Sequence, residues 1–171
     1  MTLIATFRWH DGRRYMIGDT KVNFDTGSSI YEESKLLVDD DFVFGFAGDS
    51  AMCDYVHNKI LDHPRKTLAM LDDVIRDAHE YALEKYPENS MPEADILVAT
   101  PECSVLMCTS GSSHILQSGF HAIGSGEKFA HGFWHSRQRF SDVSVFAQAM
   151  IRACSLVDPH VGGQAVVQQV G

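Results

Sequence analysis

The amino-acid sequence predicts an α+β fold, a four-layer αββα sandwich with helices outside two sheets. Strand-like and helix-like segments occur in separate groups along the chain, which is typical of α+β proteins. The run FVFGFAG at 42–48 contains only apolar residues and glycine, which indicates a strand covered on both faces. Two pairs of helical segments follow two groups of strands and would supply the outer layers. With 171 residues, the chain is expected to form one domain, 1–171.

The first part of the chain is predicted to be rich in strands. Asp11-Gly12 is a hairpin turn signal between two strand-like runs, and the second run ends at Gly18-Asp19. A turn is expected at 25–27 and an acidic turn at 39–41. The expected elements are strands at 3–7, 15–17 and 21–24, an extended segment at 28–38 and the buried strand at 42–48.

Two amphipathic helices are expected next, as an antiparallel pair lying on a sheet. Asp49-Ser50 predicts the cap of the first helix, which ends at His63-Pro64. The second helix, at about 67–86, carries an apolar stripe at helical spacing. The remaining expected elements are strands at 94–100, 104–109, 114–117 and 120–123, a helix at 127–135, a helix from 141–142 to the break at Asp158-Pro159, and a last strand at 164–170.

Composition excludes several classes of protein. The formal net charge of -9 argues against binding to nucleic acids or anionic membranes, which needs a basic face. No apolar stretch approaches 18 residues, so no membrane span is expected. The four cysteines show no C-x-x-C spacing, and the N-terminus lacks a signal-peptide pattern. A cytoplasmic protein with reduced thiols is therefore expected.

Thr2 is the strongest candidate for a catalytic residue. It directly follows Met1, and threonine is small enough for removal of the methionine to be expected. That removal would leave a hydroxyl and a free α-amine on one residue, which is a nucleophile with its own base. If Met1 is retained, the nitrogen is part of a peptide bond and cannot act as a base.

Four further motifs accompany Thr2: Gly18-Asp19, Lys35-Leu36, the segment 45–49 and the segment 123–126. Their order and spacing resemble the proteasome-type N-terminal-nucleophile (Ntn) hydrolases. The chain is most similar to proteasome β subunits and to the peptidase subunit of the bacterial two-component ATP-dependent heat-shock protease. The resemblance covers nearly the whole chain, including the two helix pairs, and implies threonine-type peptide hydrolysis.

The resemblance implies a role for each matching residue. Thr2 would be the nucleophile, and the Lys35 ammonium would lower the pKa of its α-amine by like-charge repulsion. Asp19 would orient Lys35 and keep it charged. The Gly45 N–H would stabilise the oxyanion, and Ser125 would hydrogen-bond the α-amine.

Other positions match the family less completely. Asp158 matches the aspartate of the family's Asp-x-x-Ser-Gly-Gly segment, but Val161 replaces its serine. Val43 and Ala47 are expected to face the pocket for the residue that precedes the cleaved bond, which would make this pocket apolar.

The expected function is that of a threonine-type peptidase subunit of a self-compartmentalising, proteasome-like protease. Its substrates would be peptides or unfolded proteins, and the resemblance implies a six- or seven-fold homo-oligomeric double ring with an ATPase unfoldase as partner. No cofactor or metal is expected, since His131 and His135 have no third ligand at motif spacing. Two alternatives stay open: a catalytically inactive structural or assembly subunit, favoured by Val161 and by any retention of Met1, and an Ntn amidohydrolase of a small amide.

Overall fold

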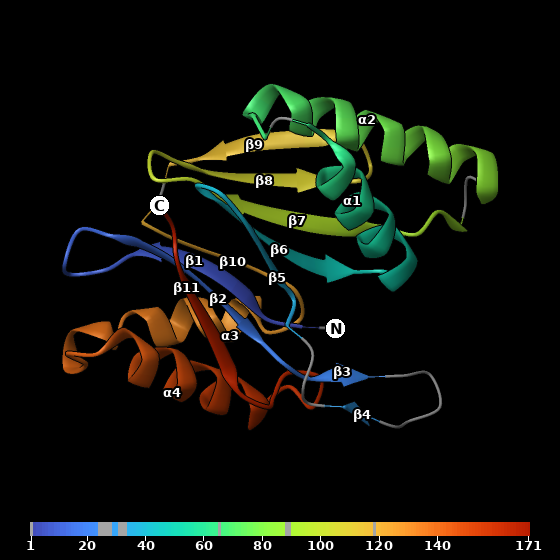
Figure 1. The fold of residues 1–171 in the computed structure, drawn as a ribbon. Coiled ribbons are helices and arrows are strands. Elements are labelled where there is room, and N and C mark those ends of the chain that lie inside the picture. The colour runs from blue at the N-terminus through green and yellow to red at the C-terminus, as the bar shows by residue number, and fades with distance from the viewer. Residues whose placement is uncertain (1, 24–28, 31–33, 65, 88–89, 118) are drawn as a thin grey trace.

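The protein has four layers, as the computed structural model shows for residues 2–23, 29–30, 34–64, 66–87, 90–117 and 119–171 (Figure 1). Two sheets face each other in the middle, and a pair of helices covers the outer face of each sheet. The predicted α+β sandwich is therefore confirmed. The helices are α1 (Ser50–Asp62), α2 (Leu68–Lys85), α3 (Glu127–Trp134) and α4 (Val143–Ser155).

Both central sheets are antiparallel. One sheet has the order β5-β6-β7-β8-β9, with β5 (Leu36–Asp39), β6 (Phe42–Gly48), β7 (Ala94–Ala99), β8 (Ser104–Cys108) and β9 (Ser112–Leu116). The other has the order β10-β1-β2-β11, with β1 (Ile4–Arg8), β2 (Arg14–Asp19), β10 (Phe120–Ile123) and β11 (Ala165–Gln169). A short ribbon of β3 (Val22–Asn23) and β4 (Ser29–Ile30) lies beside them.

Each interface between layers has its own apolar core. The core between β6–β8 and the helices α1 and α2 includes Phe44 and Ile96. The core between the two sheets includes Ile4 and Leu97. The third core, between the four-stranded sheet and the helices α3 and α4, includes Phe7. The run at 42–48 contributes to two of these cores, because alternate side chains of a strand point to opposite faces.

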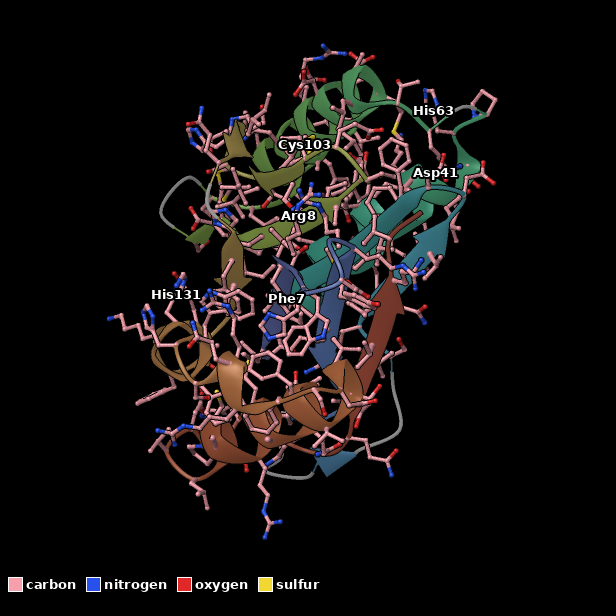
Figure 2. The ribbon with its side chains drawn as sticks, turned by 90° about the vertical axis from the view of Figure 1, so that its left-hand side faces the viewer. Phe7, Arg8, Asp41, His63, Cys103 and His131 are labelled. Carbon is pink, nitrogen blue, oxygen red and sulfur yellow. The ribbon has the colours of Figure 1, made fainter. Side chains whose placement is uncertain are left out.

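Aromatic rings fill much of the third core. Phe7 lies between its own strand and the helices α3 and α4 (Figure 2). Its ring centroid is 5.1 Å from that of Trp134 and 5.6 Å from that of Phe146, with an edge-on arrangement to Phe146. Such offset and edge-on pairs add to the stability gained from burial alone. This packing holds β1, which leads directly from Thr2, firmly against the two helices.

Side-chain caps begin three of the helices, as their sequences suggest. Asp49 accepts a hydrogen bond from the Met52 N–H at 3.0 Å and caps α1. Thr67 caps α2 in the same way, and Asp142 caps α4. Each cap satisfies one of the backbone N–H groups that a helix start leaves without an intrahelical partner.

The structure corrects several sequence-based boundaries. Within the predicted extended segment at 28–38, Ser29–Ile30 form β4, which pairs with β3, and β5 begins only at Leu36. Asp39 belongs to β5 and not to the acidic turn, and β9 begins at Ser112 instead of 114. A 3-10 helix at Arg137–Arg139 was not predicted. The predicted turn at 25–27 lies outside the described residues.

The four cysteines are free thiols, and only Cys154 is fully buried. Burial raises the pKa of the Cys53 thiol to about 12 and that of the Cys154 thiol to about 11. These two thiols therefore stay protonated near neutral pH, as inert core residues do. Across the part of the chain that the structure describes, no helix is long and apolar enough to cross a bilayer.

Gly45 is a sensitive point of the core between the sheets, and Gly45→Ala should destabilise the protein. An added Cβ would overlap Ile4 Cγ2 and would lie 3.1 Å from Met16 Sδ. We expect a loss of about 1–3 kcal/mol in the free energy of unfolding, which is typical of overpacking. Urea denaturation would measure this loss. Gly132→Ala is the matched control, since its added Cβ meets nothing within 4 Å in α3 and should be neutral or stabilising. Equal stability of the two variants would contradict the prediction.

Candidate active site

Thr2 lies just before β1, with its side chain in a buried hydrogen-bond network. The residue is only 3% exposed. Its Oγ1 donates a hydrogen bond to Asp19 Oδ1 at 2.5 Å and accepts one from Lys35 Nζ. A single hydroxyl thus has both an acceptor and a cationic donor within reach.

The Asp19 carboxylate is the centre of this network. Asp19 ends β2, next to the start of β1, because the two strands form a hairpin that pairs Ile4 with Gly18. The carboxylate is completely buried, and Oδ1 also accepts the Leu3 N–H at 2.9 Å. Oδ2 accepts the Gly162 N–H at 3.0 Å from the far end of the sequence. Such saturation with donors is what a buried carboxylate requires.

Lys35 supplies the positive charge of the site. Its ammonium lies 2.8 Å from Asp19 Oδ1 and donates to the Lys21 carbonyl at 2.5 Å. Its side chain is only 12% exposed, so solvent screens the ion pair weakly. The Lys35 carbonyl accepts the Phe46 N–H at 3.3 Å, which anchors the residue to β6. Backbone and side chain of Lys35 therefore join the two sheets at Thr2.

A glycine-containing turn at 124–126 lies against the backbone of Thr2. The pairing of β1 with β10 brings this turn there, with Ile4 opposite Ile123. At Gly124, which has a φ of 89°, a Cβ would overlap the Thr2 carbonyl oxygen, so only glycine fits. Ser125 lies between the two glycines and is exposed.

Asp158 lies in the loop at 157–164 between α4 and β11, called here the Asp158 loop. Its side chain is largely buried, and Oδ1 accepts the His160 N–H at 2.9 Å. Oδ2 is buried and accepts no direct hydrogen bond from the described residues. Burial raises the pKa of Asp158, but the nearby Ser125 hydroxyl and the His160 N–H outweigh it and hold the pKa below the usual 3.8. Asp158 is thus an anion with an acceptor atom to spare.

Val161 lies in the same loop, three residues after Asp158. The side chain is 1% exposed and belongs to the apolar core beneath the loop. Its Cγ2 would lie 2.9 Å from a Cβ at Gly126, so it packs tightly below the glycine turn. An apolar contact therefore lies close to Asp158.

Gly45, Val43 and Ala47 lie in the paired part of β6, and the roles expected for them stay a prediction. Along β6, the Phe46 N–H points to β5, so the N–H of Gly45 points to β7, where Gly45 is paired with Leu97. Its amide is therefore directed into the sheet and is not open to a substrate. Val43 and Ala47 are 1% and 5% exposed and pack in the core between the sheets.

Three groups of the network have no counterpart in the sequence-based prediction: the Leu3 N–H, the Gly162 N–H and the Lys21 carbonyl. They are backbone groups, which every residue type carries, so no residue pattern could single them out. No cluster of three or more metal-binding side chains occurs in the described ranges. His131 instead packs edge-on against Phe120, 4.9 Å between ring centroids.

The arrangement has the chemical features that an activated hydroxyl needs. The Thr2 hydroxyl donates a hydrogen bond to a carboxylate and accepts one from a cation, and the residue is almost fully buried. A nearby cation favours the alkoxide-like charge that develops on the oxygen during attack. Among the residues expected at the site, the structure brings Thr2, Asp19 and Lys35 into direct contact. Their catalytic roles stay a prediction.

The lowered pKa of Asp158 predicts a specific effect of acid on stability. The folded-state pKa of Asp158 lies below the usual 3.8, so the ionised carboxylate stabilises the fold fully at pH values above 3.8. This contribution is lost as the pH falls through the folded-state pKa. Asp158→Asn should therefore lose more stability relative to the wild type at about pH 6 than at about pH 3. Urea unfolding across this range measures the difference. Asp54→Asn, at an exposed position of α1, corrects for the loss of one charge. A difference that does not narrow in acid would contradict the prediction.

Comparison with known proteins identifies the fold. No protein-family model matches the chain, and no curated protein matches it in sequence. Among solved structures, eukaryotic HslV from Trypanosoma brucei matches with a TM-score of 0.68 and 22% identity, over 98% of both chains. BPH from Thiobacillus denitrificans, in complex with epoxomicin, matches with a TM-score of 0.76 and 19% identity, over 99% of both chains. Anbu, an ancestral β-subunit from Yersinia bercovieri, matches with a TM-score of 0.71 and 12% identity, over 98% of this chain and 80% of its own. The chain therefore has the fold of the proteasome-like Ntn hydrolases.

Proposed function

We propose that the protein is a threonine-type peptidase subunit in which Thr2 is the nucleophile. The observation that carries this proposal is the buried contact of Thr2 Oγ1 with both Asp19 and Lys35. The neighbours HslV, BPH and Anbu share the fold, which makes a hydrolase of this kind the function that the site fits best. Processing that exposes the α-amine of Thr2 is part of the proposal.

The first half of the reaction forms an ester on Thr2. The α-amine takes the hydroxyl proton while Oγ1 forms a bond to the carbonyl carbon of the peptide. The positive charge of Lys35 keeps the amine neutral enough to accept this proton and stabilises the developing charge on Oγ1. As the tetrahedral intermediate collapses, the C–N bond of the peptide breaks. The protonated α-amine of Thr2 gives its proton to the leaving amine.

Water completes the cycle. A water molecule gives one proton to the α-amine as its oxygen attacks the ester carbon. The C–Oγ1 bond then breaks, Thr2 recovers its proton and the new carboxylic acid leaves. No cofactor or metal ion is needed to balance these steps. Throughout the cycle Asp19 stays buried, and it holds Lys35 beside the reacting oxygen.

Gly48 is a better candidate than Gly45 for the donor to the oxyanion. The Phe46 N–H points to β5 and meets the Lys35 carbonyl, so the N–H of Gly48, two residues further on, points to the same side. β5 begins at Leu36, and Gly48 therefore lies beyond its end and is exposed. A φ of 121° and a close approach to Glu93 require glycine at this position. Its amide is directed to the Lys35 side of the sheet, as the role requires.

Asp158 and Ser125 fit the task of holding the α-amine. An ammonium or amine group needs acceptors, and Asp158 Oδ2 is a buried acceptor without a direct hydrogen bond from the described residues. The turn that carries Ser125 already touches the Thr2 backbone through the Gly126 N–H, 3.4 Å from the Thr2 carbonyl. Because Val161 stands where the resembled pattern has a serine, one hydroxyl is missing near the α-amine. Asp158 and Ser125 are the polar side chains that we propose to hold it.

Assembly into a ring belongs to the same proposal. The resemblance implies a double ring around a closed chamber, served by an ATPase unfoldase. Several large apolar side chains of the monomer are exposed, including Val145 at 60%, Leu156 at 82% and Val157 at 54%. All three lie at the two ends of α4, and contact with a second copy would bury them.

A non-catalytic subunit is the second candidate, and Val161 is the observation that favours it. A scaffold would not need a hydroxyl at that position, and retention of Met1 would be compatible with it. The same scaffold, however, would gain nothing from a buried lysine and aspartate placed around the Thr2 hydroxyl, since buried ion pairs add little net stability.

Thr2→Ala should abolish hydrolysis of fluorogenic peptides if the proposal is right. Loss of the nucleophile is expected to reduce kcat/KM at least about a hundred-fold, whereas Thr2→Ser, which keeps a hydroxyl, should retain measurable turnover. Ser112→Ala, which removes an exposed hydroxyl on β9, is the matched control and should behave as the wild type does. Intact mass of the same samples must show that Met1 is absent. Undiminished turnover in Thr2→Ala would eliminate Thr2 as the nucleophile, and a fully retained Met1 would favour the non-catalytic subunit.

The assembly proposal has a separate test. Light scattering coupled to size-exclusion chromatography should give a native mass close to that of two stacked rings with six or seven subunits in each ring. Leu156→Lys, which places a charge in the exposed patch at the end of α4, should lower that mass while the unfolding temperature of the subunit changes little. A wild type that elutes as a monomer at every concentration would contradict ring assembly.

A further inference from the structure

Lys21 links the Lys35 ammonium to the Asp158 loop. Its backbone carbonyl accepts a hydrogen bond from Lys35 Nζ at 2.5 Å. Its own Nζ donates to the carbonyl oxygen of Pro159 at 2.5 Å. Pro159 directly follows Asp158, so Lys21 contacts the nucleophile's cation on one side and the Asp158 loop on the other.

The Asp158 loop is also held at its far end by the two residues that precede Lys21. The Gly162 N–H donates to Asp19, and the Gln164 N–H donates to Thr20 Oγ1 at 3.0 Å. Both bonds lie several residues beyond Asp158. The bond from Lys21 is made to Pro159, which directly follows Asp158. It therefore restrains the backbone that carries the Asp158 carboxylate.

The start of the loop is stiff enough to transmit this restraint. The Asp158 N–H donates to the Cys154 carbonyl at 2.8 Å at the end of α4, and Asp158 Oδ1 accepts the His160 N–H. The ring of Pro159 fixes its φ angle. A hydrogen bond from an ammonium to the Pro159 carbonyl therefore restrains the adjacent Asp158 backbone, and charge-assisted bonds of this type are stronger than neutral ones.

We propose that Lys21 is a positioning residue whose ammonium sets the place of Asp158 relative to Thr2 and Lys35. The inference rests on the proposed function, because positioning matters only if Asp158 holds the α-amine during peptide hydrolysis. Lys21 touches no reacting atom. Its ammonium acts on Asp158 through the Pro159 carbonyl. Its own carbonyl holds the Lys35 ammonium, so Lys21 restrains both Asp158 and Lys35.

Lys21→Met isolates the effect. Methionine keeps the backbone carbonyl that meets Lys35 and has a similar apolar stem, but it has no donor for the Pro159 carbonyl. We expect kcat for a fluorogenic peptide to fall roughly ten-fold with KM nearly unchanged, since misplaced catalytic groups lower the rate of chemistry more than substrate binding. Lys21→Arg, which restores a cationic donor, should recover most of the lost kcat. Lys59→Met, which removes an exposed lysine from α1, is the matched control for loss of one charge.

Hydrogen–deuterium exchange on the same variants measures the position of the loop without any need for activity. Amides at 160–162 should exchange several-fold faster in Lys21→Met than in the wild type, in Lys21→Arg and in Lys59→Met, at similar unfolding temperatures. Unchanged exchange would overturn the proposal, and so would faster exchange with unchanged kcat. A wild type without peptidase activity would instead defeat the proposed function, and the exchange data would still decide whether Lys21 fixes the loop.

Discussion

The buried carboxylate of Asp19 is the interaction on which the site depends. It accepts bonds from Thr2, Leu3 and Lys35 through one oxygen and from Gly162 through the other. These donors come from three separate segments of the chain, so a single anion fixes the relative positions of all of them. An unpaired charge at this depth would cost several kcal/mol, which makes any arrangement that breaks the network unfavourable. The position of the Thr2 side chain therefore depends on electrostatics as well as on packing.

Most of the fold could be predicted from the sequence because its strongest signals are local. Apolar periodicity and capping residues such as Asp49 and Asp142 indicate helices without knowledge of their neighbours. The run at 42–48 is apolar on both faces of the strand, which required a layer on each side. A strand at 21–24 and an extended segment at 28–38 were expected, but the pairing of β3 with β4 was not predicted. Pairing joins two segments, which periodicity within one segment cannot report.

The site was only partly predictable, for a related reason. Thr2, Asp19 and Lys35 have side chains whose chemistry is visible in the sequence, and the structure brings them together. The segment 45–48 contains two glycines, and a sequence does not reveal which amide a neighbouring strand already uses. The register of β6 with β5 and β7 decides which amides are used: the Gly45 N–H points to β7, whereas Gly48 lies beyond the end of β5. Contacts of backbone carbonyls and amides are fixed by tertiary structure alone.

The bond between Gly162 and Asp19 has a further consequence for the order of events during synthesis. It joins residues that are 143 positions apart, and β11 pairs with β2 immediately beyond it. Contacts of such long range form late, since the entropy of closing a large loop must be overcome first. A nascent chain that has not yet released its C-terminal strand from the ribosome thus lacks part of the shell around Asp19. The hydroxyl of Thr2 would reach its final environment only once the whole chain has folded.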